Sequence, residues 1–132
     1  MKKIYPLLLA VTAVLFVKPV TAQEKAKWNE MEAFHEVMSK TFHPSEEGKL
    51  EPIRTRSQEM LDKAIAWKNS SAPEGYDKNV VKKSLDNLVK GAKEINRLVK
   101  SKAADDILKK KLSALHDVFH EIMEKCEKED HH

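Results

Sequence analysis

Four stretches of the sequence carry apolar residues at alternating spacings of three and four, and this pattern constrains the fold more than any other feature. The stretches run from Trp28 to Phe42, Ile53 to Trp67, Val81 to Val99 and Leu108 to Cys126. Such spacing places apolar side chains along one face of an α-helix. The predicted inward positions are Trp28, Met31, His35, Met38 and Phe42; Ile53, Ser57, Met60, Ala64 and Trp67; Val81, Leu85, Leu88, Ala92, Ile95 and Val99; and Leu108, Leu112, Leu115, Phe119, Ile122 and Cys126.

Helix-breaking and helix-capping residues gather between these stretches, in the segments 43–52, 69–77 and 100–106. Pro44 predicts an extended His43 and the end of the first helix before it, because a residue before proline avoids the helical conformation. Asp77 has the side chain of a helix N-cap. Four helices with short connections predict an all-α protein, an up-down-up-down four-helix bundle in which the first and last helices are antiparallel neighbours.

The first 22 residues have the composition of a secretory signal peptide. Lys2 and Lys3 precede an apolar run from Leu7 to Val17, and the small residue Ala22 closes the segment. The run is too short to span a bilayer as a helix. We therefore expect a signal peptide at residues 1–22, a bundle domain at residues 23–132, export to the periplasm or medium, and no membrane segment in the mature protein.

Removing the signal peptide changes the charge balance. The chain has 24 basic and 21 acidic residues, and Lys2, Lys3 and Lys18 would leave with the signal peptide. The remaining 21 basic and 21 acidic residues balance, which argues against a nucleic-acid partner or an anionic membrane. Cys126 is the one cysteine and has no internal disulfide partner. A small buried side chain, a soft-metal ligand and an intermolecular disulfide all remain open for it.

Three histidines are candidate metal ligands. His35 falls on the predicted inward face of the first helix, and His116 and His120 share one flank of the fourth. Antiparallel pairing of these helices would bring Met31, Glu32, His35, His116 and His120 to one level of the bundle. Imidazoles beside a carboxylate or thioether suit zinc, copper or iron. The alternative is that His35 is a hydrogen-bonded core residue and that His116 and His120 lie at the edge of a solvated surface.

Other chemistry has less support in the sequence. The motifs at Glu32-x-x-His35 and Asp117-x-x-His120 look like half of a di-iron site, but the second and third helices lack inward carboxylates to complete it. No Gly-rich elbow or phosphate-binding loop accompanies the serines and histidines. These observations predict a protein that is not an enzyme.

The order of Met31 early in the first helix and His116 or His120 late in the fourth resembles the small periplasmic b-type cytochromes. The architecture is similar to that of the c′-type cytochromes as well. The resemblance to the b-type family implies that Met31 and either His116 or His120 would bind the iron of heme b. The segments 34–48 and 115–122 also look like those of uncharacterised small exported bacterial helical proteins, which supports the fold.

Two functions follow as expectations. The first is a periplasmic metal-binding bundle, with a free ion or heme between the first and fourth helices, acting as a carrier, a sensor or an electron-transfer protein with a redox partner. The second is a non-enzymatic bundle that acts through protein contacts, with structural histidines.

Overall fold

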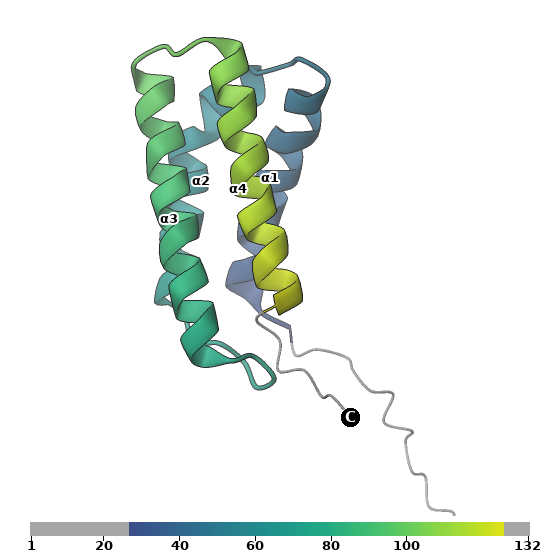
Figure 1. Cartoon of the computed structure of the whole chain (residues 1–132), viewed down its shortest axis with the longest axis vertical. Coiled ribbons are helices and arrows are strands. Elements are labelled where there is room, and N and C mark those ends of the chain that lie inside the picture. The colour runs from purple at the N-terminus through teal and green to yellow at the C-terminus, as the bar shows by residue number, and fades with distance from the viewer. Residues whose placement is uncertain (1–26, 126–132) are drawn as a thin grey trace, which may run out of the picture.

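A computed structural model of the chain describes residues 27–125, and every regular element within that range is an α-helix. The four helices are α1 (Asn29–Glu46), α2 (Glu51–Asn69), α3 (Lys78–Lys100) and α4 (Asp105–Lys125). They pack against one another around a single core (Figure 1). The predicted all-α four-helix fold is confirmed. The predicted signal peptide and Cys126 lie outside the described residues.

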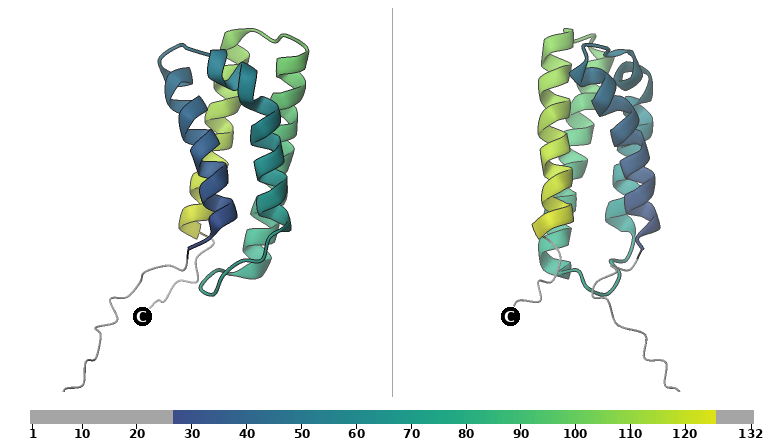
Figure 2. Two further views of the ribbon diagram at one scale, coloured as in Figure 1. Left: turned by 180° about the vertical axis from the view of Figure 1, so that it is seen from behind. Right: turned by 90° about the vertical axis from the view of Figure 1, so that its right-hand side faces the viewer.

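Each helix packs against two neighbours. The packed pairs are α1 with α2, α2 with α3, α3 with α4, and α4 with α1. The connections α1–α2 and α3–α4 lie at one end of the molecule and the connection α2–α3 lies at the other (Figure 1, Figure 2). The backbones of α1 and α4 approach each other least closely of the four pairs. Helices α1 and α3 therefore occupy diagonal corners.

The helix boundaries follow local chemistry, with one correction. Asp77 is the N-cap of α3, as predicted, and its carboxylate accepts hydrogen bonds from the backbone N–H of Asn79 and Val80 at 3.1 and 3.2 Å. Helix α1 does not end before Pro44 but continues through it to Glu46. Pro44 has no N–H, so α1 continues through it without one of its backbone hydrogen bonds. The chain leaves the helix at Gly48, whose φ of +85° suits a residue without a side chain.

The predicted core is confirmed along α2, α3 and α4. All five predicted positions of α2 are buried, and the serine among them is only 4% exposed. In α3 and α4 every predicted position within the described residues is buried except Val99, which is partly buried and packs against the core. The buried residues are Ile53, Ser57, Met60, Ala64, Trp67, Val81, Leu85, Leu88, Ala92, Ile95, Leu108, Leu112, Leu115, Phe119 and Ile122.

The inward face predicted for α1 is confirmed in part: Trp28 and Met38 are buried, and Met31 and Phe42 pack against the core. The exception is His35, which is exposed, and the preceding residue Phe34 is fully buried in its place. The buried face of α1 consists of Phe34, Val37, Met38, Thr41 and Ser45. Phe34 is buried rather than His35 because removing a phenylalanine ring from water stabilises the fold more than removing an imidazole does. A buried imidazole would also need hydrogen-bond partners for its nitrogens. Thr41 tolerates burial because its hydroxyl donates to the Val37 carbonyl at 2.9 Å.

A small polar network crosses the interface between α2 and α3. The Ser57 hydroxyl donates to Asn96 Oδ1 at 2.8 Å, and Asn96 Nδ2 donates to Gln58 Oε1 at 2.9 Å. Ser57 and Asn96 are both buried, so each needs the other to satisfy its polar atoms. The network fixes the register of α2 against α3.

Charge is distributed unevenly between the diagonal helices. Helix α1 carries four acidic residues and one basic residue, whereas α3 carries seven basic residues and two acidic ones. Most of these charged residues are exposed. One corner of the bundle is therefore acidic and the diagonal corner is basic.

Candidate functional site

Aromatic and imidazole rings fill the interface between α1 and α4. The ring of Phe42 on α1 stacks on the ring of His116 on α4, with centroids 3.7 Å apart and planes 2° apart. One turn further along α4, the centroid of His120 lies 4.4 Å from that of His116, with the rings at 74°. His116 is partly buried and His120 is exposed. The predicted pair on the flank of the fourth helix thus meets α1 at Phe42.

The third predicted histidine lies elsewhere on this interface. The ring of His35 is stacked on Phe119, with centroids 5.2 Å apart and planes 5° apart. Seven residues separate His35 from Phe42, which is about 10 Å along the helix axis. The ring centroid of Phe119 also lies 5.8 Å from that of His120, so His35 approaches the α4 pair from the side of His120, whereas Phe42 covers His116. That the three histidines lie at one level stays a prediction.

Met31 and Glu32 lie at the end of α1 that is far from His116. Met31 is partly buried and packs against the core. Glu32 is exposed, and its carboxylate forms an ion pair with Lys27 at 3.8 Å. Within residues 27–125, no three His, Cys, Asp or Glu side chains are placed to hold one metal ion. The structure brings together His116 and His120 out of the five predicted ligands.

The surroundings of His116 keep its imidazole neutral. Burial lowers the pKa of His116 below its usual value of 6.5, and the neighbouring His120 and His43 lower it further. The carboxylates of Asp117 and Glu46 oppose this effect. Within the described part of the chain neither His116 nor His120 forms a hydrogen bond through its ring. The ring nitrogens of both imidazoles therefore have no hydrogen-bond partner among residues 27–125.

The spacing of the pair is compatible with a shared ion. A metal bound to an imidazole nitrogen at about 2.0–2.1 Å lies roughly 3.2 Å from that ring's centroid. Two centroids 4.4 Å apart would then be about 90° from each other around the ion. That is the angle between adjacent ligands in the tetragonal coordination of Cu²⁺ or Ni²⁺, and it is smaller than the tetrahedral angle that Zn²⁺ prefers.

The arrangement does not fit heme held by Met31 and His116. Eleven residues separate Met31 from Phe42, the ring stacked on His116, and this is about 16 Å along the axis. At the level nearer Met31, Phe34 and Phe119 lie with ring centroids 5.9 Å apart, and Phe34 and Trp67 with centroids 5.5 Å apart. Rings packed this closely leave no space for a porphyrin between the helices.

Two features of this site are absent from the sequence-based prediction. Phe42 was expected in the core, and its place over His116 depends on the exact crossing of α1 and α4. His43 was expected beyond the helix end, whereas it is helical and its ring lies 5.6 Å from that of Phe42. Its proximity to His116 could have been found from the sequence only by extending α1 through Pro44.

None of the helices within residues 27–125 has the length and hydrophobicity needed to cross a bilayer. No family model, no curated protein and no solved structure matches the chain.

Proposed function

We propose that this protein is an exported up-down-up-down four-helix bundle that binds a transition-metal ion through His116 and His120 and carries it without catalysing a reaction. The observation that supports the proposal best is the pair of imidazole centroids 4.4 Å apart on the flank of α4. We infer that Cu²⁺ is the preferred ion among copper, zinc and iron, because the pair suits ligands about 90° apart. The proposal involves no nucleic acid.

The local environment of the pair supports reversible binding. A neutral imidazole is the form that binds metal, and the lowered pKa of His116 keeps that form dominant at neutral pH. His120 is exposed, so an ion can reach the pair from solvent. Two protein ligands leave coordination positions for water or for a ligand from another molecule. A carrier needs such positions to pass its ion on, whereas a structural site is closed.

Isothermal titration of Cu²⁺ and Zn²⁺ into the purified protein tests this site. The parent protein for the test carries His131→Ala, His132→Ala and Cys126→Ser, which removes other strong ligands near the chain end. We expect one Cu²⁺ per chain, with an affinity that falls about tenfold or more in both His116→Ala and His120→Ala. His35→Ala is the matched control and should change the affinity less than about twofold. Unchanged affinity in His116→Ala and His120→Ala would reject the site.

An absorption spectrum of protein isolated from the periplasm separates the free-ion proposal from the heme alternative. A protein that holds a free ion gives no Soret band. A Soret band that shifts in Met31→Ala would instead establish heme ligation through Met31 and require α1 to move away from α4.

The second candidate function is a non-enzymatic bundle that acts through protein contacts. Its support is that the rings of His116 and His35 are stacked on Phe42 and Phe119, so both histidines have a packing role without any ion. This alternative predicts that His116→Ala lowers stability and that no metal binds stoichiometrically.

Export is tested separately. The mature chain should begin near Gln23, because the small residue Ala22 closes the predicted signal peptide. Intact-mass measurement on periplasmic protein gives the result, and a retained Met1 would contradict it.

A further inference from the structure

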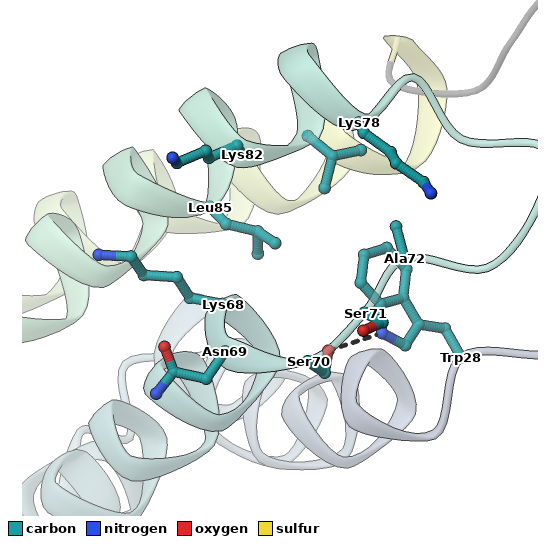
Figure 3. A pocket seen from close by; sticks show the side chains of 10 residues that line it. Trp28, Lys68, Asn69, Ser70, Ser71, Ala72, Lys78, Lys82 and Leu85 are labelled. Carbon is teal, nitrogen blue, oxygen red and sulfur yellow. Dashed lines mark hydrogen bonds between the residues drawn. The ribbon is translucent and has the colours of Figure 1, made fainter.

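A cleft of about 490 Å³ lies between the end of α2 and the start of α3 (Figure 3). Its apolar residues Trp28, Val81 and Leu85 are at most 3% exposed, and Trp28 Nε1 donates a hydrogen bond to the Ser70 hydroxyl at 2.8 Å. The lysines that line the cleft are exposed to solvent. The cleft therefore offers a ligand almost no apolar surface, and we assign no site to it.

The packing of α1 against α4 determines which side chains meet where the start of α1 lies beside the end of α4 (Figure 1, Figure 2). Going back along α1 from Phe42 to His35, the stacked ring on α4 moves forward from His116 to Phe119. A step of seven residues is about two helical turns, and it leads from Phe42 to His35 on α1 and from His116 to Met123 on α4. Because both steps have the same length and direction along the bundle, this register places His35 opposite Met123.

Met31 adds a second thioether on the same side of α1. It precedes His35 by four residues, a spacing at which side chains on a helix are neighbours. Met31 and Met123 are partly buried and pack against the core, whereas His35 is exposed. A methionine side chain has three rotatable bonds and a polarizable sulfur, so it can turn toward a ligand without a change in the backbone.

Two thioethers and one imidazole form a soft ligand set. Sulfur ligands favour Cu⁺, whereas Cu²⁺ favours nitrogen and oxygen ligands in a tetragonal arrangement. Zn²⁺ takes Cys, His, Asp or Glu ligands, and within residues 27–125 no three such side chains are placed around one ion. Cu⁺ is therefore the ion that this set fits.

We propose that Met31, His35 and Met123 form a Cu⁺ site at the end of the α1–α4 interface. The two thioethers supply ligands from the partly buried side, and the exposed imidazole supplies the third ligand from the solvent side. The site shares no ligand with the proposed Cu²⁺ pair of His116 and His120. It is an addition to that function, and each can fail alone.

Anaerobic competition for Cu⁺ with the chromogenic ligand bicinchoninate, in the presence of ascorbate, tests the site in the full mature chain. The parent protein again carries Cys126→Ser, His131→Ala and His132→Ala, because a cysteine thiolate would itself bind Cu⁺. We expect one Cu⁺ per parent chain, and no Cu⁺ binding at all would overturn the proposal.

Conservative variants identify the ligands. Met31→Leu and Met123→Leu keep the side-chain volume, and His35→Phe keeps a ring against Phe119. Each should lower the Cu⁺ affinity about tenfold or more. Met38→Leu is the matched control in the same helix and should change the affinity less than about twofold. Unchanged affinity in both Met31→Leu and Met123→Leu, or an equal loss in Met38→Leu, would overturn the site.

The double variant His116→Ala with His120→Ala separates this site from the Cu²⁺ pair. It should keep the Cu⁺ affinity within about twofold of the parent protein, although it removes both ligands proposed for Cu²⁺. A loss of Cu⁺ confined to this double variant would place Cu⁺ on the histidine pair and overturn the proposal.

Nuclear magnetic resonance of protein labelled with ¹³C at the methionine methyl groups gives a second, direct measurement. Cu⁺ should shift the methyl resonances of Met31 and Met123 and leave those of the fully buried Met38 and Met60 in place. The absence of a shift at both Met31 and Met123 would overturn the proposal.

Discussion

The interface between α2 and α3 and the interface between α1 and α4 are built in different ways. In the first, the helix backbones approach closely, and the buried Ser57–Asn96 hydrogen bond fixes their register. In the second, the backbones stand further apart, and rings fill the space, with Phe42 on His116 and His35 on Phe119.

If the proposed metal site is correct, this small bundle separates stability and binding between two interfaces. Hydrogen bonds in a close interface need both partners in place and leave no free polar atoms. Stacked rings satisfy packing while their edges keep unpaired nitrogen atoms. The α1–α4 interface can therefore carry ligands that the α2–α3 interface has no room for.

The largest expected effect tests whether the wider interface is as well packed as the closer one. Phe119→Ala removes a ring that contacts Phe34, Trp67 and His35, and should cost about 3–5 kcal/mol of unfolding free energy. Leu88→Ala in α3 should cost about 2–5 kcal/mol, because it leaves a cavity at a fully buried position. Urea denaturation measures both, with the exposed Lys93→Ala as a control expected within about 0.5 kcal/mol of wild type.

A loss below about 1 kcal/mol in Phe119→Ala, beside a large loss in Leu88→Ala, would contradict this expectation. The rings between α1 and α4 would then be loosely held in solution.

A smaller effect is expected from the polar network between α2 and α3. Asn96→Ala leaves the buried Ser57 hydroxyl without its acceptor and should cost about 1–3 kcal/mol. The double variant Ser57→Ala with Asn96→Ala should cost less than the sum of the two single changes, because it removes both partners of one bond. The same urea titrations provide the double-mutant cycle. Additive costs would mean that this hydrogen bond does not couple the two helices.

The smallest effect distinguishes the interfaces by pH. His116 has a pKa below 6.5 in the folded protein, so as the pH falls below that value the unfolded chain binds a proton that the folded protein excludes. The stabilising contribution is complete above pH 6.5 and is lost as the pH falls through the lower folded value. His116→Phe keeps a ring against Phe42 and should lose less stability between pH 8 and pH 5.5 than wild type does.

Denaturation with chelator present measures this slope without bound metal. Asn96→Ala is the matched control, and its slope should equal that of wild type. Equal slopes for His116→Phe and wild type would show that His116 titrates normally and that its burial has no effect on stability.

The sequence predicts the inward face of α2 fully and that of α1 in part, for a physical reason. In α2 all the predicted positions, Ser57 among them, are buried. In α1 two sets of residues at helical spacing share Met38, and the buried one contains Thr41 and Ser45. A threonine hydroxyl that donates a hydrogen bond to a carbonyl of its own helix can be buried with little loss of stability. A prediction from hydropathy takes no account of this hydrogen bond.

The candidate site was predicted in part. The i, i+4 spacing places His116 and His120 together on one helix whatever the rest of the fold does, so this pair was accessible from the sequence. Which residues of α1 lie beside this pair depends on how far each helix is shifted along its axis. That shift is set by the packing of all four helices in the core. Within residues 27–125 no third His, Cys, Asp or Glu joins the pair to hold one ion, and this could not be foreseen from the spacing within α4.

The acidic corner at α1 and the basic corner at α3 give this bundle an electric dipole that runs between two diagonal helices. The positive and negative charges of such a protein nearly balance but lie apart. The protein therefore orients in an electric field even when its net charge is close to zero. At low ionic strength it would adsorb to both cation and anion exchangers, through different corners, and salt would release it from both. The charge map thus sets which face the molecule presents to a charged surface.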